Sequence, residues 1–469
     1  AKLDAVTATS GGGSAKVTQT GAITSYTGKG VIVTSGSSTA TLEGSGAITA
    51  KGDAITVSSS VSATVNHTSG AIESTNGSGI KVSASGGTAS VTNSGKITAF
   101  QDGIRSEATY SNTISQTGAI TASNGAGIWA TSSGGSVSVT SSGNIESKTT
   151  GIHAKSESGN VIVAQTGTVT SNAGKGIDTY TPSGSITIGT GAVVSKLDGI
   201  TATNLSGQAI GITSAGVTSY DGAGILASSA TGSITITNND AVTAQLEGIK
   251  ATNLGDGTVS ITQNGGLTSY SKTGITAWSS TGAINVTGEG DITAELDGIK
   301  IGNEGYGTIT IDRSGVITAY KGSAIIASST DGEISVKNAG VITAELDGIV
   351  ATNIGAAKVS VTQNGNLTAY KGTGIVASSA SGEVAVSNTG TLVADLDGIV
   401  ATNKGDTTVS VYQNGNLTAN KGTGIVATST TGEVSVTSIG QLIADLDGIV
   451  ATNVGMQDVT VDAGGVTAN

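Results

Sequence analysis

Few residues of this 469-residue chain could carry out covalent chemistry. The chain has no cysteine, no serine stands in a nucleophile elbow, and its two histidines are His67 and His153. The two lie in different copies of a repeat described below, and the spacing of stacked strands separates them by about 19 Å. Because the members of a catalytic dyad must touch, we expect no catalytic residue and no enzyme activity.

Acidic residues that recur in a Leu-Asp-Gly or Leu-Glu-Gly motif are the candidates for binding a metal ion. Successive motif acids are two repeats apart, about 9.6 Å, which is too far for two of them to share one ion. The calcium-binding nonapeptide is also absent. We therefore interpret the acids as structural corners and predict neither a metal nor a cofactor. The motif acids are Asp198, Glu247, Asp297, Asp347, Asp397 and Asp447.

Tyrosines at a regular interval are the first candidates for a binding surface. Four of them follow the same strand-like phrase at intervals of 50 residues: Tyr220, Tyr270, Tyr320 and Tyr370. We call this set the Tyr column. Outward aromatic faces at a regular spacing can stack on sugar rings or on a neighbouring protein. Packing across adjacent strands is the alternative.

A second candidate surface departs from the repeat. The residue after Gly-Ile or its equivalent is Arg105, Trp129 and His153 in three successive repeats, with Lys81 before them and Asp178 after them. Trp and Arg are enriched at binding hot spots. We call Arg105, Trp129 and His153 the Trp129 patch; random variation in a less regular part of the chain is the alternative origin.

All these residues are positioned by an internal repeat. The segment LDGIVATN begins at Leu346, Leu396 and Leu446, and the related phrase GTGIVA lies between the copies, so each 50-residue period has two similar halves. Counting the Gly-Ile pairs or their equivalents gives 19 repeats of 23 to 26 residues. Each repeat holds three short alternating runs separated by Gly, Asn, Asp or Lys, which predicts three strands and three turns.

The alternation puts apolar residues on one face of each run and polar residues on the other. In the repeat over 398–423, for example, Ile399, Ala401 and Val409 share one parity, whereas Thr402 and Ser410 share the other. A short one-sided strand cannot bury its apolar face alone, but a coil stacked on copies of itself can. We therefore predict an all-β fold, a single-stranded right-handed parallel β-helix (β-solenoid) of about 19 coils of about 24–25 residues, with three short strands per coil.

We predict one continuous β-solenoid over 1–469, less regular over 1–198 and built from two-coil repeats of 50 residues over 199–469. The chain has 73 Gly and one Pro. We expect Gly, Asn and Asp to supply positive φ at the corners.

Composition excludes several partners. The net charge is −12, and the two arginines are Arg105 and Arg313, so no basic surface is available for nucleic acid. No apolar run approaches the roughly 20 residues of a membrane-spanning helix. We expect neither nucleic-acid binding nor membrane insertion by this segment.

The coil pattern G-I-x-A-x-x-x-G-x-[VI]-x-[VI]-x-x-x-G-x-[IV]-T-A, rich in Gly, Ser, Thr, Ala and Asn, resembles the passenger domains of Gram-negative autotransporters and related secreted adhesins. The resemblance covers essentially the whole chain. It implies an extracellular or cell-surface location, secreted or attached to the outer membrane, and a rod that serves as an adhesin passenger or as a fibre subunit in attachment and matrix formation. The implied partners are other copies of the chain, head to tail or lateral, or a glycan or protein on a host or neighbouring cell.

The two ends of the sequence match each other in phase. Joined end to start they read GVTANAKLDAV, which imitates the internal corner AVVSKLDGI. The sequence therefore predicts head-to-tail stacking into filaments, and two cuts from a longer rod would produce the same match. The stacking residues would be Lys2, Leu3, Asp4, Val466, Thr467, Ala468 and Asn469.

Two other functions remain as alternatives. The fold class also contains proteins that bind or cleave polysaccharides. An ice-binding face is the less favoured alternative, since outward threonines recur in seven successive coils, but Val393 and Ile443 interrupt them further along. The threonines are Thr218, Thr243, Thr268, Thr293, Thr318, Thr343 and Thr368.

Overall fold

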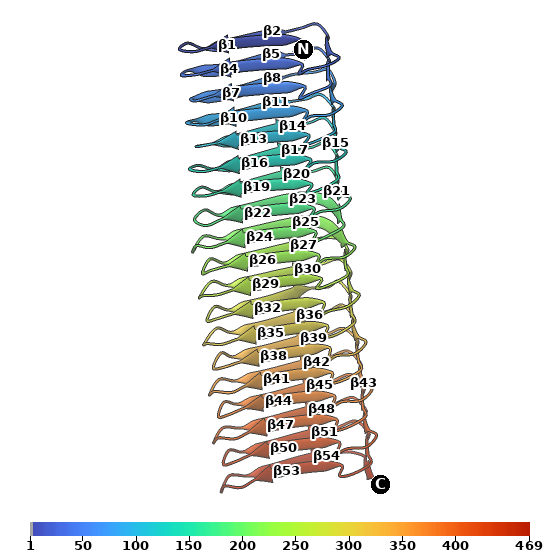
Figure 1. The fold of residues 1–469 in the computed structure, drawn as a ribbon. Helices are drawn as coiled ribbons and strands as arrows, with labels where there is room; N and C mark the ends of the chain where they lie inside the picture. The colour runs from blue at the N-terminus through green and yellow to red at the C-terminus, as the bar shows by residue number, and fades with distance from the viewer. Residues whose placement is uncertain (1–2) are drawn as a thin grey trace. The chain divides into compact units, whose positions relative to one another are not determined.

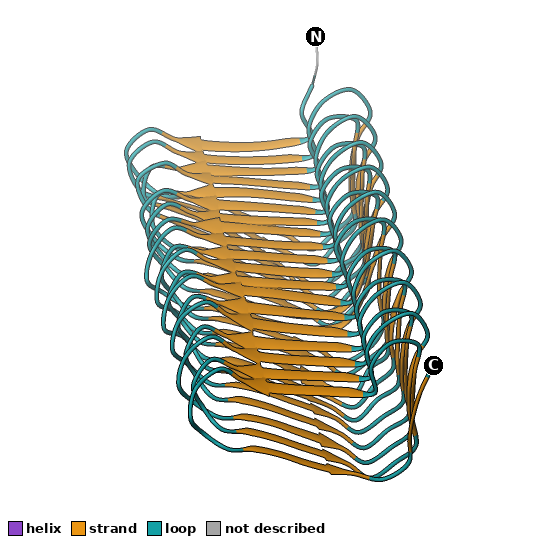
Figure 2. Ribbon diagram, turned by 90° about the horizontal axis from the view of Figure 1, so that it is seen from below, coloured by secondary structure: helices purple, strands orange, loops and turns teal. Residues whose placement is uncertain are grey.

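The computed structural model of the protein describes residues 3–469. Its strands stack in parallel as a β-solenoid of about 19 turns, and the described residues form no helix (Figures 1 and 2). The predicted fold class is confirmed. The contacts of the chain divide it into two compact units, residues 1–230 and 231–469.

The first strand of each turn carries most of the side chains discussed below. It begins at the Gly-Ile pair or its equivalent, and within each unit it pairs in register with the first strand of the next turn. In the first unit these strands are β1 (Val6–Ser10), β4 (Val31–Ser35), β7 (Ile55–Ser59), β10 (Ile80–Ala84), β13 (Ile104–Ala108), β16 (Ile128–Ser132), β19 (Ile152–Ser156), β22 (Ile177–Thr181), β24 (Ile200–Asn204) and β26 (Ile225–Ser229).

The second unit repeats the arrangement more regularly. Its first strands are β29 (Ile249–Asn253), β32 (Ile275–Ser279), β35 (Ile299–Asn303), β38 (Ile325–Ser329), β41 (Ile349–Asn353), β44 (Ile375–Ser379), β47 (Ile399–Asn403), β50 (Ile425–Ser429) and β53 (Ile449–Asn453).

The second and third strands complete each turn. In the turn that begins with β41 they are β42 (Val359–Gln363) and β43 (Leu367–Ala369). Two turns differ from the predicted three strands: β23 (Ile186–Ser195) and β25 (Ile210–Ser219) each run through the second and third positions without a break. They pair with each other over nine residues, so at this place the corner between the two strands is replaced by extended chain.

The core is a stack of small aliphatic layers, as the alternation predicts. Ile349, Ala351, Val359 and Val361 are 0–1% exposed, which confirms their inward assignment. The core residues of each turn lie directly on those of the next because the strands pair in register, for example Ile349 with Ile375. Burying these side chains is the main favourable term in the stability of such a stack.

Glycine at the corners is required by close contact between turns, and our expectation of positive φ is wrong. Within residues 3–469 no residue other than Gly has positive φ, and only Gly70, Gly216 and Gly288 among the glycines do. A Cβ on Gly332 would lie 1.9 Å from the carbonyl oxygen of Gly307 in the preceding turn. The backbones of successive corners touch, and no side chain fits between them.

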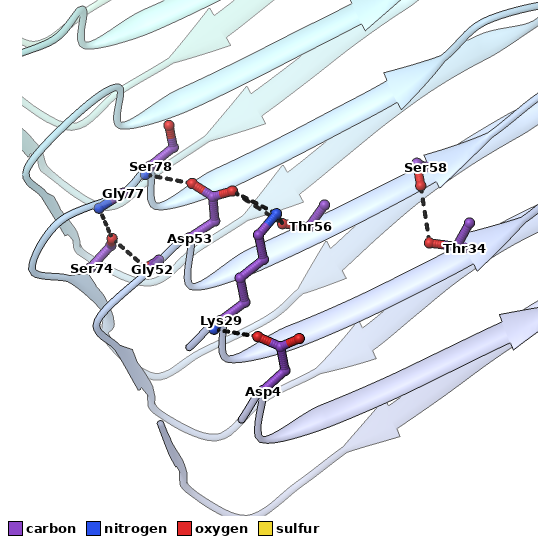
Figure 3. A network of polar contacts seen from close by, with 10 residues as sticks. All are labelled: Asp4, Lys29, Thr34, Gly52, Asp53, Thr56, Ser58, Ser74, Gly77 and Ser78. Carbon is purple, nitrogen blue, oxygen red and sulfur yellow. Dashed lines mark hydrogen bonds and ion pairs between the residues drawn. The ribbon is translucent and has the colours of Figure 1, made fainter. Parts of the chain in front are cut away.

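Acids at several corners, among them four of the motif acids, tie one turn to the next. In the first unit, Asp53 Oδ1 accepts a hydrogen bond from the backbone N–H of Ser78 at 3.0 Å, and Lys29 Nζ lies 3.0 Å from Asp53 Oδ2 (Figure 3). In the second unit, Asp347 Oδ1 accepts from the N–H of Thr373 at 2.8 Å. The same bond is made by Asp198, Asp297 and Asp397. These bonds confirm the structural interpretation of those four motif acids.

Candidate binding surfaces

The Trp129 patch forms one continuous cross-strand stack in the first unit. Arg105, Trp129 and His153 occupy the same position of β13, β16 and β19 and pair in register. The rings of Trp129 and His153 stack with centroids 3.9 Å apart and planes inclined by 24°. The Arg105 guanidinium lies over the indole, 5.4 Å from its centroid. The indole of Trp129 therefore has a side chain from each neighbouring strand against it.

The charged groups of the patch also hold partners. Arg105 pairs with Glu107 at 2.7 Å and with Asp102 at 3.5 Å. Burial lowers the pKa of Arg105, but the hydrogen bonds and charges of these two carboxylates outweigh it and the pKa is raised. His153 Nδ1 lies 3.0 Å from Asp178 Oδ2. The geometry favours a stabilising role for the stack, and its role in binding remains a prediction.

Asp178 ends the stack and is strongly held in its ionised form. Its side chain is 27% exposed and accepts hydrogen bonds from His153 and from Lys175 Nζ at 2.9 Å. Burial raises the pKa of this carboxyl, but the hydrogen bonds and charges of His153 and Lys175 outweigh burial and lower the pKa well below its ordinary value.

The Tyr column is exposed, as its outward parity predicts. Tyr220 in the first unit is 60% exposed, and Tyr270, Tyr320 and Tyr370 in the second are 59–60% exposed. Each follows a third strand, and the three tyrosines of the second unit lie on alternate turns, about 9.6 Å apart. Their rings are free to contact a flat partner.

Acids of the preceding turns pair with three lysines on this edge, two of which directly follow Tyr320 and Tyr370. Lys321 lies 2.5 Å from Glu295, Lys371 lies 2.5 Å from Glu345, and Lys421 lies 2.9 Å from Asp395. These exposed pairs contribute little stability individually. They do keep like charges from lying directly on one another along this edge.

The threonines of the ice-binding alternative form an outward, half-exposed column. In the second unit Thr243, Thr268 and Thr293 pair in register on the third strands, and further along the pattern is interrupted where Thr368 pairs with Val393. Threonine is also an ordinary outward residue of strands, so the column alone does not indicate ice binding.

Polar residues inside the corners were missed by the sequence analysis. His67 is fully buried, with Nδ1 2.8 Å from Asn93 Oδ1 and Nε2 2.9 Å from the carbonyl oxygen of Gly46. In the second unit Asn338 donates to Gln363 Oε1 at 2.9 Å, and Asn388 donates to Gln413 Oε1 at 2.9 Å. These side chains end the second strands, where strand parity points inward and the corner carbonyls need donors.

Arg313 stands in the same buried ladder. It is 1% exposed and donates to the carbonyl oxygens of Gln263 at 3.0 Å and Thr287 at 2.8 Å. Burial lowers the pKa of Arg313 to about 10, so the guanidinium stays charged at neutral pH. Gly288 makes room for it, because a Cβ there would lie 2.9 Å from the guanidinium. In the sequence, Gly288 and Arg313 both depart from the repeat, and they lie one turn apart.

A second missed feature is a row of outward aliphatic side chains on the first strands of the second unit. Ile326 pairs with Val350, and the register continues through four further strands. We call this row the valine stripe: Ile326, Val350, Val376, Val400, Val426 and Val450. The sequence indicates this row through the Val that recurs in the phrase GIVA. Strand alternation places that Val on the outward face, although valine is typical of the core.

The predicted stacking residues lie at exposed edges, apart from Lys2, which is outside the described residues. Leu3 is 74% exposed, and Asp4 Oδ1 accepts from the N–H of Lys29 at 2.8 Å, as the internal motif acids do. Val466 is 42% exposed, whereas its counterpart Leu417 is fully buried. In the described structure no further turn covers β55 (Val466–Ala468).

Two searches of the described residues bear on metals and membranes. Residues 3–469 contain no group of three or more His, Cys, Asp or Glu side chains placed to hold a metal ion. They also contain no helix with the length and apolar character needed to cross a bilayer.

Comparison of the chain with protein-family models, curated proteins and solved structures finds no match.

Proposed function

We propose that this protein is a structural component of the cell surface or extracellular matrix, of the adhesin or fibre-subunit type, whose copies associate laterally through the valine stripe. The resemblance of the repeat to autotransporter passengers supports the location. The stripe itself carries the proposal of self-association, because its composition differs from that of the other surfaces of the molecule.

The strands that carry the stripe are free of charge. The strands β38, β41, β44, β47, β50 and β53 read IIASS, IVATN, IVASS, IVATN, IVATS and IVATN, without one charged residue. Beside the stripe runs a second outward row of Ser and Thr, for example Thr352, Ser378 and Thr402. The result is a regular surface of aliphatic and hydroxyl side chains.

A second copy of the chain fits this surface better than an unrelated protein does. Two copies with net charge −12 repel each other, and a face without charge is where they can approach at the lowest cost. The stripe of a second copy has the same spacing of about 4.8 Å, so its branched side chains can interdigitate with this one. Sheets that pack in this way lie about 10 Å apart.

The size of the surface predicts weak association for a single contact. Six strands span only about 29 Å at about 4.8 Å per strand. A stable interface usually buries more than about 1,200 Å², which a surface this short does not reach alone. Several contacts formed together would hold copies in a fibre or matrix.

Sedimentation velocity over a range of protein concentrations tests the proposal. We expect the protein to associate reversibly and more strongly as salt is added, because salt screens the repulsion between copies. The variant Val350→Asp/Val400→Asp places two charges on the stripe and should weaken association by about tenfold or more.

The matched control is Thr318→Asp/Thr368→Asp, which has the same net charge and places its two charges two strands apart on the third-strand face. It should associate almost as the parent does. Equal weakening in both variants, or a parent that stays monomeric at every concentration, contradicts lateral association. Long assemblies that persist in the stripe variant would be assigned to the proposed head-to-tail contact of Leu3 and Asp4 with β55.

The Tyr column is the candidate for attachment to a glycan or protein of another cell, because its rings are exposed whereas the indole of Trp129 is covered on both sides. The triple variant Tyr270→Ala/Tyr320→Ala/Tyr370→Ala should reduce attachment of protein-coated beads to cells several-fold. Its melting temperature should change little, since the side chains are exposed. If attachment is unchanged, the Tyr column is not the binding surface, and Trp129 and Arg105 become the residues to test.

A further inference from the structure

Trp278 and Gly302 are paired departures from the repeat. Trp278 on β32 and Gly302 on β35 face each other in register. In the strands that follow, the same outward position holds Ser328, Thr352 and Ser378. A bulky ring and a missing side chain therefore occur side by side in a row that otherwise holds small hydroxyl residues.

The missing side chain opens a depression beside the indole. A Cβ on Gly302 would lie 3.3 Å from Trp278 Cδ1 and 3.8 Å from Ser328 Oγ, so the indole lies close against the glycine and a side chain there would compete with it for space. The depression has a volume of about 420 Å³, within the range of small-molecule sites. Ile354, which is 68% exposed and lies in the turn after β41, also lines it.

This environment differs from that of the other tryptophan. The indole of Trp129 is stacked on His153 and covered by Arg105, so neither face is open. The indole of Trp278 has no such neighbour on the side of Gly302. An open indole beside a shallow depression provides a platform for a flat, partly apolar ring.

The side chains around the platform are mostly uncharged, and the two charged ones have opposite signs. Lys300 and Glu304 are the charged residues of the lining, one of each sign, and Lys300 lies 3.9 Å from Asp297. The hydroxyl residues Thr276 and Thr330 border the depression. Such a lining suits a neutral molecule with several hydroxyl groups and disfavours an ion.

We propose that this depression binds one ring of a neutral oligosaccharide, with the apolar face of a hexopyranose against Trp278 and its hydroxyls toward Thr276, Thr330 and Lys300. Aromatic side chains bind such rings because the C–H groups on one face of the sugar are apolar. The site goes beyond lateral self-association and does not depend on it, since the two use different residues and a monomer can bind the sugar.

The fluorescence of Trp278 can report on this site directly. The chain has two tryptophans, so in Trp129→Phe the emission comes from Trp278 alone. We expect cellohexaose, chitohexaose or laminarihexaose to shift this emission saturably at millimolar concentrations. Calorimetry on the parent protein with the same sugars checks that the Phe background has not created the binding.

Three variants separate the site from general effects on the strand. Gly302→Thr restores the residue typical of the repeat and fills the depression, and Trp278→Ala removes the platform; each should weaken binding by about tenfold or more. Thr402→Ala changes the same row away from the depression and should bind as the parent does. Since Gly302→Thr brings a Cβ close to the indole, thermal melting must show that it folds, and Trp278→Ala tests the site independently.

The proposal is overturned if none of the three sugars gives a saturable change, or if calorimetry shows that Trp278→Ala binds with unchanged affinity. Binding of a charged oligogalacturonate in place of the neutral sugars would also overturn it. Loss of sugar binding with unchanged sedimentation would leave the proposed self-association standing, so the two proposals can fail separately.

Discussion

The fully buried Ile349 shows how little tolerance the narrow core has at a single position. The variant Ile349→Asp puts an unpaired carboxylate between two turns and should lower the free energy of unfolding by more than about 4 kcal/mol. Its neighbour Val350 is half-exposed on the other face of the same strand, and Val350→Asp should cost less than about 1 kcal/mol. Chemical denaturation of both variants measures the difference; similar losses would show that the two faces of β41 are assigned wrongly.

Asp178 predicts a dependence of stability on pH. Its pKa is lower in the folded protein than the 3.8 of an ordinary aspartate, so its contribution is fully present above about pH 3.8 and is lost as the pH falls toward the folded value. The variant Asp178→Asn should be less stable than the parent by about 1–2 kcal/mol at pH 5 to 7. Melting curves from pH 7 to pH 2 should show the two proteins converging at the acid end. A gap that stays constant over this range would contradict the role of the charge.

The sequence predicts the position of a single residue correctly where that position depends only on strand register. Arg105, Trp129 and His153 were expected at one position of successive strands and are found there, in contact. The contact of the indole with both neighbours could not be foreseen, because it depends on rotamers. Arg313 was missed because an arginine is normally outward, and only its pairing with Gly288 reveals that space exists for it.

At the scale of the element, strand positions and their inward faces were predictable because alternation with a period of two survives even in five-residue strands. The corners were less predictable. Gly and Asn are typical both of turns with positive φ and of corners that touch, and the sequence does not separate these causes. The continuous strands β23 and β25 likewise depend on how two neighbouring turns pair with each other.

The valine stripe shows the limit of assigning faces by residue type. A valine on an outward position looks like a core residue until its register is known, and its neighbours Ile349 and Ala351 mark the inward face. Trp278 was missed for a related reason: its significance lies in Gly302, which is 24 residues away in the sequence and adjacent in the sheet.

For the molecule as a whole, the fold class followed from the repeat, whereas its function did not. A repeat of this kind specifies stacking, since each turn can bury its apolar face only on another turn. It leaves the outward positions free to vary, and these decide what the molecule binds. The stripe, the Tyr column and the Trp278 depression are therefore separate questions for experiment.

The alternation between successive turns makes a prediction about the length of the chain. Deleting residues 375–398 removes one turn and brings Lys371 next to Lys421 and Gln363 next to Gln413, so that Lys421 loses Asp395 and Gln413 loses Asn388. Deleting residues 349–398 removes two turns and lets Glu345 meet Lys421 and Asn338 meet Gln413. The smaller deletion should therefore melt at a lower temperature than the larger one, with a difference of about 1–3 kcal/mol. The opposite order of melting temperatures would contradict this view of the corners.

The same alternation has a genetic consequence. Within the regular repeats, a duplication or loss of 50 residues brings lysine next to acid and Asn next to Gln again, whereas a change of one half-period leaves mismatched corners at the junction. Unequal recombination between copies of the repeat would thus yield folded products mainly when it shifts the chain by whole pairs of turns. The copies of LDGIVATN lie 50 residues apart, which is the spacing that such a step requires.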